Sequence, residues 1–386
     1  MNQTARIISI YAADTSGVCS ALYEYGGMTV IHDASGCNST YTTHDEPRWY
    51  DKKSMMFISG ITEKDAVMGN DDKFIDDLII AANELKPAFI ALCASPLPAM
   101  IGTDLDAIAF AVESETGIPS FSVKTNGMSS YISGAANAFV EISKHFTKEN
   151  PDINASLNMS DKTDRLKINI LGITPLDFPL RSSYDSLLEF INDSGFELNS
   201  CVGVNTCLED IVNLSDADVN LVVSSVGVSL ADHLYDEFSI PYVKGVPYGK
   251  EFSFRIGDYI KESFSTKTNI DSTKDLRCEG DTAILGESIQ SASLASALLL
   301  DKGIKACVLE TVGEGDLDIL KPFDLSCDDE KILEDELRKF KTVLGDPLFK
   351  PIVHDADFIP LPHEAFSGRC FTKSAPNLIY TDLDFL

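Results

Sequence analysis

Short apolar segments alternate with amphipathic segments along most of this chain, and this alternation most constrains its fold. Between residues 166 and 243 the segments typical of strands and those typical of helices follow one another over short loops, with strands at 166–171, 197–202, 219–224 and 240–243 and helices at 183–194, 207–214 and 229–238. Such an order predicts a parallel sheet covered by helices. The same plan recurs before residue 150 and after residue 281, so we expect an α/β protein built from three similar units.

The chain has 386 residues, which is too long for one ordinary core. A polar stretch over 148–164 separates the first unit from the second, and a charged connector over 250–281, helical at its start, separates the second from the third. We therefore expect an N-terminal α/β domain over 1–150, a second domain over 165–249, and a third domain with an irregular C-terminal tail over 282–386.

In the first unit the apolar pattern predicts strands over 6–11, 29–32, 55–59, 88–93 and 118–123, and helices over 14–23, 71–85 and 103–116. Thr103 or Asp104 is suited to cap the third of these helices. Pro96 and Pro98 are expected to stiffen a loop after Cys93.

The charge balance excludes several classes of partner. The formal net charge is −29, from 31 basic and 60 acidic residues. Nucleic acids and anionic membrane surfaces both attract clustered Lys and Arg, so neither is an expected partner. No apolar run approaches the ~20 residues of a membrane span, and the N-terminus lacks the pattern of a signal peptide. We expect a cytoplasmic protein.

Two of the nine cysteines share one sequence context. Cys37 and Cys93 each follow an apolar strand and precede a turn, and no C-x-x-C pair occurs. If the two strands are neighbours, both thiols lie at the carboxyl edge of one sheet, where ligands bind in α/β proteins. Thiolates bind iron-sulfur clusters, so a cluster is one interpretation. The alternative is that these cysteines, like Cys19 within its helix, are small buried apolar residues.

Small and polar residues surround the Cys37 segment. Ser35, Gly36 and Gly102 are the candidate cofactor-binding residues, and the two glycines would allow the backbone to come close to a cofactor. His44 lies in a polar loop and is either a proton donor or a solvated side chain. His363, within Leu-Pro-His, lies either near a domain cleft or in a structural position. No phosphate-binding loop or G-x-G-x-x-G motif occurs, so we expect no directly bound nucleotide.

Three segments resemble one known family. The segment from His32 to Cys37, followed by Tyr41, His44 and the Arg48-Trp49 pair, resembles the cluster-binding segment of nitrogenase component 1 subunits. The stretch from 86 to 105, with Lys-Pro, a strand to the cysteine and Ile-Gly-Thr-Asp-Leu, is similar to a second region of that family. Residues 217–249 look like its second domain.

The resemblance implies three Rossmann-like domains with parallel sheets around a central cleft. It also implies electrons from a separate ATP-dependent iron-sulfur reductase, a homodimer or a heterodimer with a related subunit, and a small-molecule substrate. Cys37 corresponds directly to a cluster ligand of the family, Cys93 by proximity, and Cys19 as a third candidate. A [4Fe-4S] cluster, completed by a third cysteine or a partner chain, is therefore expected.

Two departures limit what the resemblance implies. Cys19 and Cys93 are displaced from the family's ligand positions, so an asymmetric eight-iron cluster is not expected. Cys201 is near, but does not match, the position that anchors the nitrogenase cofactor, so nitrogen fixation is not predicted. Two other functions remain open: a non-catalytic scaffold for cluster or cofactor assembly, and a clusterless α/β protein that binds a small molecule.

Overall fold

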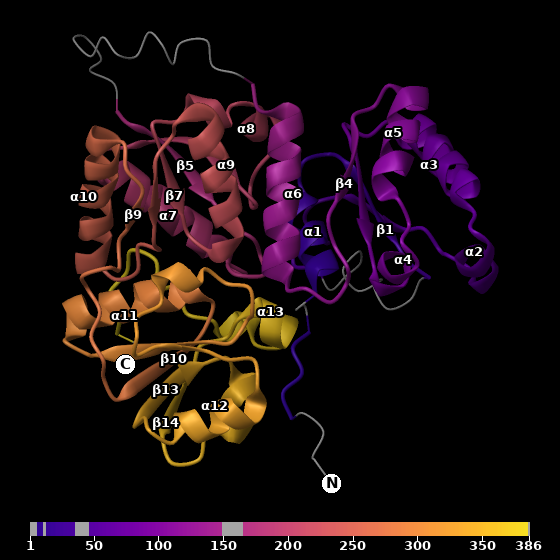
Figure 1. Cartoon of the computed structure of the whole chain (residues 1–386). Coiled ribbons are helices and arrows are strands. Elements are labelled where there is room, and N and C mark those ends of the chain that lie inside the picture. Colours follow the sequence, from indigo (N-terminus) through magenta and orange to yellow (C-terminus); the bar gives the residue numbers. More distant parts are fainter. Residues whose placement is uncertain (1–5, 11–12, 35–45, 149–164, 385–386) are drawn as a thin grey trace.

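Three separate parallel sheets organise the computed structural model, which describes residues 6–10, 13–34, 46–148 and 165–384 (Figure 1). The first sheet has the strand order β2-β1-β3-β4, and every pairing in it is parallel. Its strands are β1 (Met28–His32), β2 (Met55–Ile58), β3 (Ile90–Ala94) and β4 (Ser120–Val123).

The described helices of this first unit are α1 (Asp14–Leu22), α2 (Glu63–Met68), α3 (Asp71–Leu85), α4 (Pro96–Ile101), α5 (Leu105–Thr116) and α6 (Tyr131–Phe146). The predicted helix over 71–85 is confirmed, and it buries Phe74, Leu78 and Ala82 along one face. The predicted cap of α5 is also confirmed, because the Asp104 carboxylate accepts from the amide of Ala107 at 3.0 Å.

Two expectations for the first unit are wrong. Residues 6–10 form no strand: the Ile8 side chain is 75% exposed, and Arg6 instead pairs with Glu330 and Glu334 of the third unit. An apolar pattern is not sufficient for a strand, because the segment must also pair with a neighbouring strand. The segment around Pro96 and Pro98 is the short helix α4 rather than a loop, since the first turn of a helix does not need the amides that proline lacks.

The second sheet has the order β6-β5-β7-β8-β9 and is also parallel throughout. Its strands are β5 (Lys167–Leu171), β6 (Glu197–Val202), β7 (Val219–Val222), β8 (Tyr242–Lys244) and β9 (Ile270–Asp271), and its helices are α7 (Arg181–Asp193), α8 (Leu208–Val212), α9 (Val228–Phe238) and α10 (Glu251–Thr266). The alternation predicted over 166–243 is confirmed. The segment expected as a connector supplies α10 and the edge strand β9 of this sheet.

The third sheet has the order β12-β11-β10-β13-β14, again parallel. Its strands are β10 (Thr282–Gly286), β11 (Ala306–Glu310), β12 (Leu325–Ser326), β13 (Thr342–Gly345) and β14 (Asp357–Pro360), and its helices are α11 (Ser288–Lys302), α12 (Glu330–Leu337) and α13 (Glu364–Ser367). The C-terminal tail then returns to the second unit, where Ile379 forms an antiparallel bridge with Tyr248.

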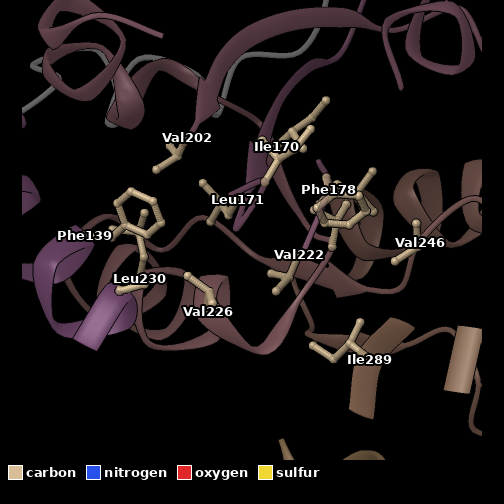
Figure 2. Packing of buried hydrophobic residues seen from close by; sticks show 14 of the residues in the cluster. Phe139, Ile170, Leu171, Phe178, Val202, Val222, Val226, Leu230, Val246 and Ile289 are labelled. Carbon is tan, nitrogen blue, oxygen red and sulfur yellow. The ribbon is translucent and has the colours of Figure 1, made fainter. Parts of the chain in front are cut away.

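The three units share one continuous core. Helix α6 lies between the first and second sheets, and α11 lies between the second and third (Figure 1). Phe139 of α6, Ile170 of β5 and Ile289 of α11 belong to the same buried cluster (Figure 2). Burial of this apolar surface is the main stabilising term, so it fixes the units relative to one another.

A buried arginine adds a polar connection between the first two units. Arg48 donates to the carbonyl of Ser20 at 2.8 Å, to Glu46 at 2.6 Å and, in the second unit, to the carbonyl of Gly203 at 3.0 Å. Glu24, which also contacts Arg48, completes the pairing. A buried cation is tolerated because its donors are satisfied in this way.

The longest described helices, α6 and α10, have 16 residues each. Across the part of the chain that the structure describes, each helix is too short or too polar to traverse a lipid bilayer.

Candidate functional site: a buried acid-base pocket between the second and third sheets

The carboxyl ends of the second and third sheets face a common pocket. Asp177 lies in the turns that follow β5, Glu287 directly follows β10, and His363 lies three residues after β14. Loops at the carboxyl ends of parallel strands are the usual ligand-binding positions of α/β sheets. The pocket has a volume of about 70 Å³ and is lined by these three residues together with Tyr248 and Gln290, among others.

Asp177 is at the centre of this arrangement. Its side chain is fully buried, and its Oδ1 atom accepts from the phenolic hydroxyl of Tyr131, on α6, at 2.5 Å. Nε2 of His363 lies 3.2 Å from the same oxygen, although without hydrogen-bond geometry. Oδ2 of Asp177 has no hydrogen-bond partner among the described residues. A buried carboxylate with an unsatisfied oxygen is costly unless a ligand or water fills the gap.

Glu287 links the second and third units. Its carboxylate caps α11 by accepting from the amides of Ile289 at 3.0 Å and Gln290 at 2.8 Å, and it accepts from the amide and hydroxyl of Ser225 in the second unit. Burial, followed by the negative charge of Asp177, raises the pKa of Glu287 to about 7. This carboxyl group therefore exchanges its proton near neutral pH.

His363 and Tyr131 complete the buried set. Burial would lower the pKa of His363, but the contact with Asp177 and the charges of Asp346 and Glu287 more than offset it, so that its pKa is raised. Burial and the charge of Asp177 raise the pKa of Tyr131 well above its usual value, so this phenol stays protonated as a donor. The backbone amide of His363 donates to Asp346 at 2.8 Å, which fixes the loop after β14.

A second polar side chain of the pocket lining, Gln290, has an unpartnered donor. The amide oxygen of Gln290 accepts from the hydroxyl of Tyr248 at 3.3 Å, while its Nε2 has no partner among the described residues. The residues that line the pocket thus include one acceptor atom and one donor atom without a partner among the described residues.

Four of the predicted site residues, Ser35, Gly36, Cys37 and His44, lie outside the described residues. The strands that precede the two matched cysteines are neighbours, as expected: Ile31 of β1 is opposite Cys93 of β3 in a parallel pair. Cys93, however, is the fourth residue of β3 rather than part of the turn after it.

Cys93 and Cys19 lie together in apolar packing. They are 0% and 1% exposed and belong to one hydrophobic cluster. Burial raises the pKa of Cys19 to about 12 and raises that of Cys93 well above its ordinary value. Within the described ranges, no three His, Cys, Asp or Glu side chains are grouped so that they could hold a metal ion. These two thiols are therefore placed as core residues.

Gly102 ends α4 with a φ of 75° and lines a second pocket, of about 390 Å³, beside the first sheet. His32 lines the same pocket; it stacks on Phe74 with ring centroids 4.2 Å apart and its Nδ1 lies 2.9 Å from Oγ of Ser59. Burial lowers the pKa of His32 to about 4, so it is neutral at physiological pH.

The sequence analysis did not identify Asp177, Glu287 or Tyr131. It did name His363, with two alternatives: a position near a domain cleft or a structural position. A signal was present for Glu287, which directly follows the apolar strand β10, and a weaker one for Asp177, which lies in the turns after β5. The same reasoning selected Cys37. Tyr131 carries no such signal, because its role depends on the packing of α6 against the second unit.

The fold and pocket together define a class: an α/β protein of several Rossmann-like units with a pocket at the junction of two of them. A family model described as "Nitrogenase component 1 type Oxidoreductase" matches residues 17–272. That match covers more than half of the chain, and the protein belongs to this family. The resemblance drawn from the sequence is confirmed.

Several similar proteins are subunits of light-independent protochlorophyllide reductases. A light-independent protochlorophyllide reductase subunit of Crocosphaera subtropica is 24% identical over 198 residues, which cover 45% of this chain and 39% of that protein. Its counterpart in Mesostigma viride is 23% identical over 291 residues, covering 69% and 57%. These alignments span less than two thirds of the relatives' own lengths.

Solved structures share the fold. The structure described as nitrogenase Cp1 at pH 5 matches with a TM-score of 0.58 at 16% identity, covering 93% of this chain and 77% of that one. Nitrogenase Cp1 at pH 6.5 matches with a TM-score of 0.56 at 17% identity, covering 80% and 63%. These matches confirm the predicted α/β class with Rossmann-like units.

Proposed function

We propose that the protein is a reductase subunit of the nitrogenase component 1 type that binds a small molecule in the pocket between its second and third units. The observation that carries this proposal is the buried set of Asp177, Glu287 and His363 around that pocket, with one carboxylate oxygen of Asp177 unpartnered among the described residues. Membership of an oxidoreductase family supports the redox character of the reaction.

The residues of the pocket would bind the substrate and supply protons. Oδ2 of Asp177 accepts a hydrogen bond from the substrate, and Tyr131 holds the carboxylate in place through Oδ1. Burial and the charge of Asp177 raise the pKa of Glu287 to about 7, so this carboxyl group holds a transferable proton near neutral pH, and the pKa of His363 is raised as well. A reduction that consumes protons as well as electrons can draw them from these two groups.

The partners are part of the proposal. Electrons would come from a separate ATP-dependent iron-sulfur reductase, and the functional unit would be a dimer, either of this chain or with a related subunit. The similarity to proteins that are each named as one subunit of a reductase supports the second arrangement.

An iron-sulfur cluster is the cofactor that the family implies, and the described cysteines do not fit one as they are packed. Cys19 and Cys93 are buried among apolar side chains, and their raised pKa values disfavour the thiolate that a cluster needs. The proposal of a [4Fe-4S] cluster therefore depends on Cys37 and on ligands from a partner chain. Cys93 and Cys19 would join it only after local rearrangement.

Anaerobic purification with iron and sulfide analysis tests the cluster. The wild-type protein should carry iron and sulfide, and Cys37→Ala should lose most of both. Cys201→Ala, a change at a buried thiol of the second unit, is the matched control and should keep the wild-type iron content. Iron-free wild-type protein after anaerobic reconstitution, or a Cys37→Ala variant with as much iron as the wild type, would contradict the proposal.

A second candidate, a clusterless protein that binds a small molecule in the same pocket, is favoured by the burial of Cys19 and Cys93. A colourless protein that still binds a ligand at the pocket would establish this candidate. Absorbance in the iron-sulfur charge-transfer region would exclude it.

A further inference from the structure

The pocket beside Asp177 has a definite size and a definite pattern of unused polar atoms. Its volume is about 70 Å³, which is enough for several water molecules or one small organic molecule.

The unpartnered atoms indicate which hydrogen-bonding groups a ligand must carry. Oδ2 of Asp177 is a buried acceptor without a partner among the described residues, so it requires a donor from the ligand. Nε2 of Gln290 is a buried donor that is likewise unpartnered within the described part of the chain, so it requires an acceptor. One molecule that satisfies both must carry an N–H or O–H group and a lone-pair oxygen or nitrogen.

The charge at the pocket disfavours carboxylate ligands. Asp177 and Glu287 both line it, and no Lys or Arg does so within the described ranges. A ligand carboxylate would bring a third acid into a buried space with His363 as the single basic group facing it. It would also present an acceptor to Oδ2 of Asp177, which needs a donor.

We propose that this pocket binds a small uncharged ligand of the amide type, which donates an N–H to Oδ2 of Asp177 and accepts from Nε2 of Gln290. This inference rests on the proposal that the substrate of the protein binds here, and it names the chemical class of that substrate.

Propionamide and propionate are a matched pair of probes, because each has five non-hydrogen atoms and they differ only in replacing the amide N–H₂ with a charged oxygen. Titration followed by saturation-transfer difference NMR measures binding of each to the full-length protein. Propionamide should bind at least ~10-fold more tightly than propionate, since the amide gains a hydrogen bond to a charged acceptor that the carboxylate cannot make. Equal affinities, tighter binding of propionate, or no binding of either would overturn the proposal.

Two substitutions test whether propionamide binds in this pocket. Asp177→Asn keeps an oxygen to accept from Tyr131 but replaces the charged acceptor, so it should reduce propionamide affinity by ~10-fold or more and narrow the preference over propionate. Asp258→Asn, an exposed acid on α10, is the control and should leave both affinities unchanged. If Asp177→Asn does not fold, Gln290→Leu serves instead, because it removes the unpartnered donor and should also weaken propionamide. Retention of full affinity in a folded variant of either pocket residue would overturn the proposal.

Iron and sulfide are measured on the same preparation. NMR binding does not require a cluster or a reductase, so a protein without iron that binds propionamide contradicts the cluster proposal alone. A protein with a cluster that binds neither probe, or prefers propionate, contradicts the ligand class alone.

Discussion

The hydroxyl of Tyr131 donates to Oδ1 of Asp177 across 2.5 Å, and this contact joins helix α6 of the first unit to the turn after β5 in the second. Both side chains are buried, so the hydrogen bond forms away from water. A hydrogen bond to a charged acceptor in such surroundings is stronger than one between neutral groups. The pocket carboxylate is thereby held by a helix that also packs against the first sheet.

Replacement of Tyr131 by Phe should lower the free energy of unfolding by about 1.5–3 kcal/mol, because it removes a hydrogen bond to a buried carboxylate while leaving the ring packing in place. Chemical denaturation followed by circular dichroism measures the change. Tyr235→Phe, on the partly exposed surface of α9, is the control and should alter stability by less than about 0.5 kcal/mol. Equal stability of the two variants would show that the Tyr131–Asp177 contact contributes nothing.

Glu287 should make stability fall as pH rises toward neutrality. Its ordinary pKa is 4.5 and its pKa in the folded protein is about 7, raised by burial and then by the charge of Asp177. Between these two pH values the folded protein keeps a proton that the unfolded chain has released, so the unfolding free energy decreases as pH increases. The stabilising contribution is complete below about pH 4.5 and is lost above about pH 7.

The Glu287→Gln variant isolates this effect, since glutamine keeps an oxygen for the amides of α11 but does not titrate. The unfolding free energy of the wild type relative to this variant should decrease by on the order of 3 kcal/mol from pH 4.5 to above pH 7. Glu262→Gln, at an exposed position of α10, should track the wild type at every pH. A wild-type profile parallel to that of Glu287→Gln would mean that Glu287 titrates normally.

Thiol labelling should separate the cysteines by burial. Iodoacetamide reacts with thiolates, so Cys207, Cys278 and Cys370, which are exposed, should be labelled first, whereas Cys19 and Cys93 should stay unlabelled in the native protein. Peptide mass spectrometry after short pulses at pH 8 gives the rates, and a denatured sample shows that every thiol is reactive once exposed. Labelling of Cys19 or Cys93 at the rate of Cys207 would show that this part of the core opens, as ligation by these thiols would require.

Much of the fold was predictable because it depends on local pattern. The apolar stripe of α3, the Asp104 cap and the alternation from β5 to β8 are all properties of neighbouring residues, and each is confirmed. The segment over 6–10 was wrongly predicted to be a strand. A strand must pair with the edge of a sheet, and the sequence of the segment alone does not show whether such an edge lies beside it. Edge strand β9 was missed for the converse reason, since two residues carry no periodicity.

The candidate site was less predictable, because its four members come from four separate parts of the chain. An acid after an apolar strand could have marked Asp177 and Glu287, whereas only the packing of α6 brings Tyr131 to the first of them. For Cys93 the error was a single residue. The predicted strand ended at this cysteine, whereas β3 continues to Ala94, so the thiol lies in the core and not at the rim of the sheet.

Two glycines should prove essential to the position of α6. A Cβ at Gly17 of α1 would lie 2.0 Å from the carbonyl oxygen of Tyr131, and one at Gly134 of α6 would lie 1.9 Å from that of Asp14. Both contacts involve backbone atoms, so alanine at either position must push the two helices apart.

Gly17→Ala and Gly134→Ala should each lower the unfolding free energy by about 1–3 kcal/mol, although alanine favours a helix over glycine by up to ~1 kcal/mol. Gly257→Ala in α10, where the nearest atom is Oγ of Ser194 at 3.6 Å, should be neutral or stabilising. Chemical denaturation of the three variants checks this, and a Gly17→Ala protein as stable as Gly257→Ala would refute the close approach of α1 and α6.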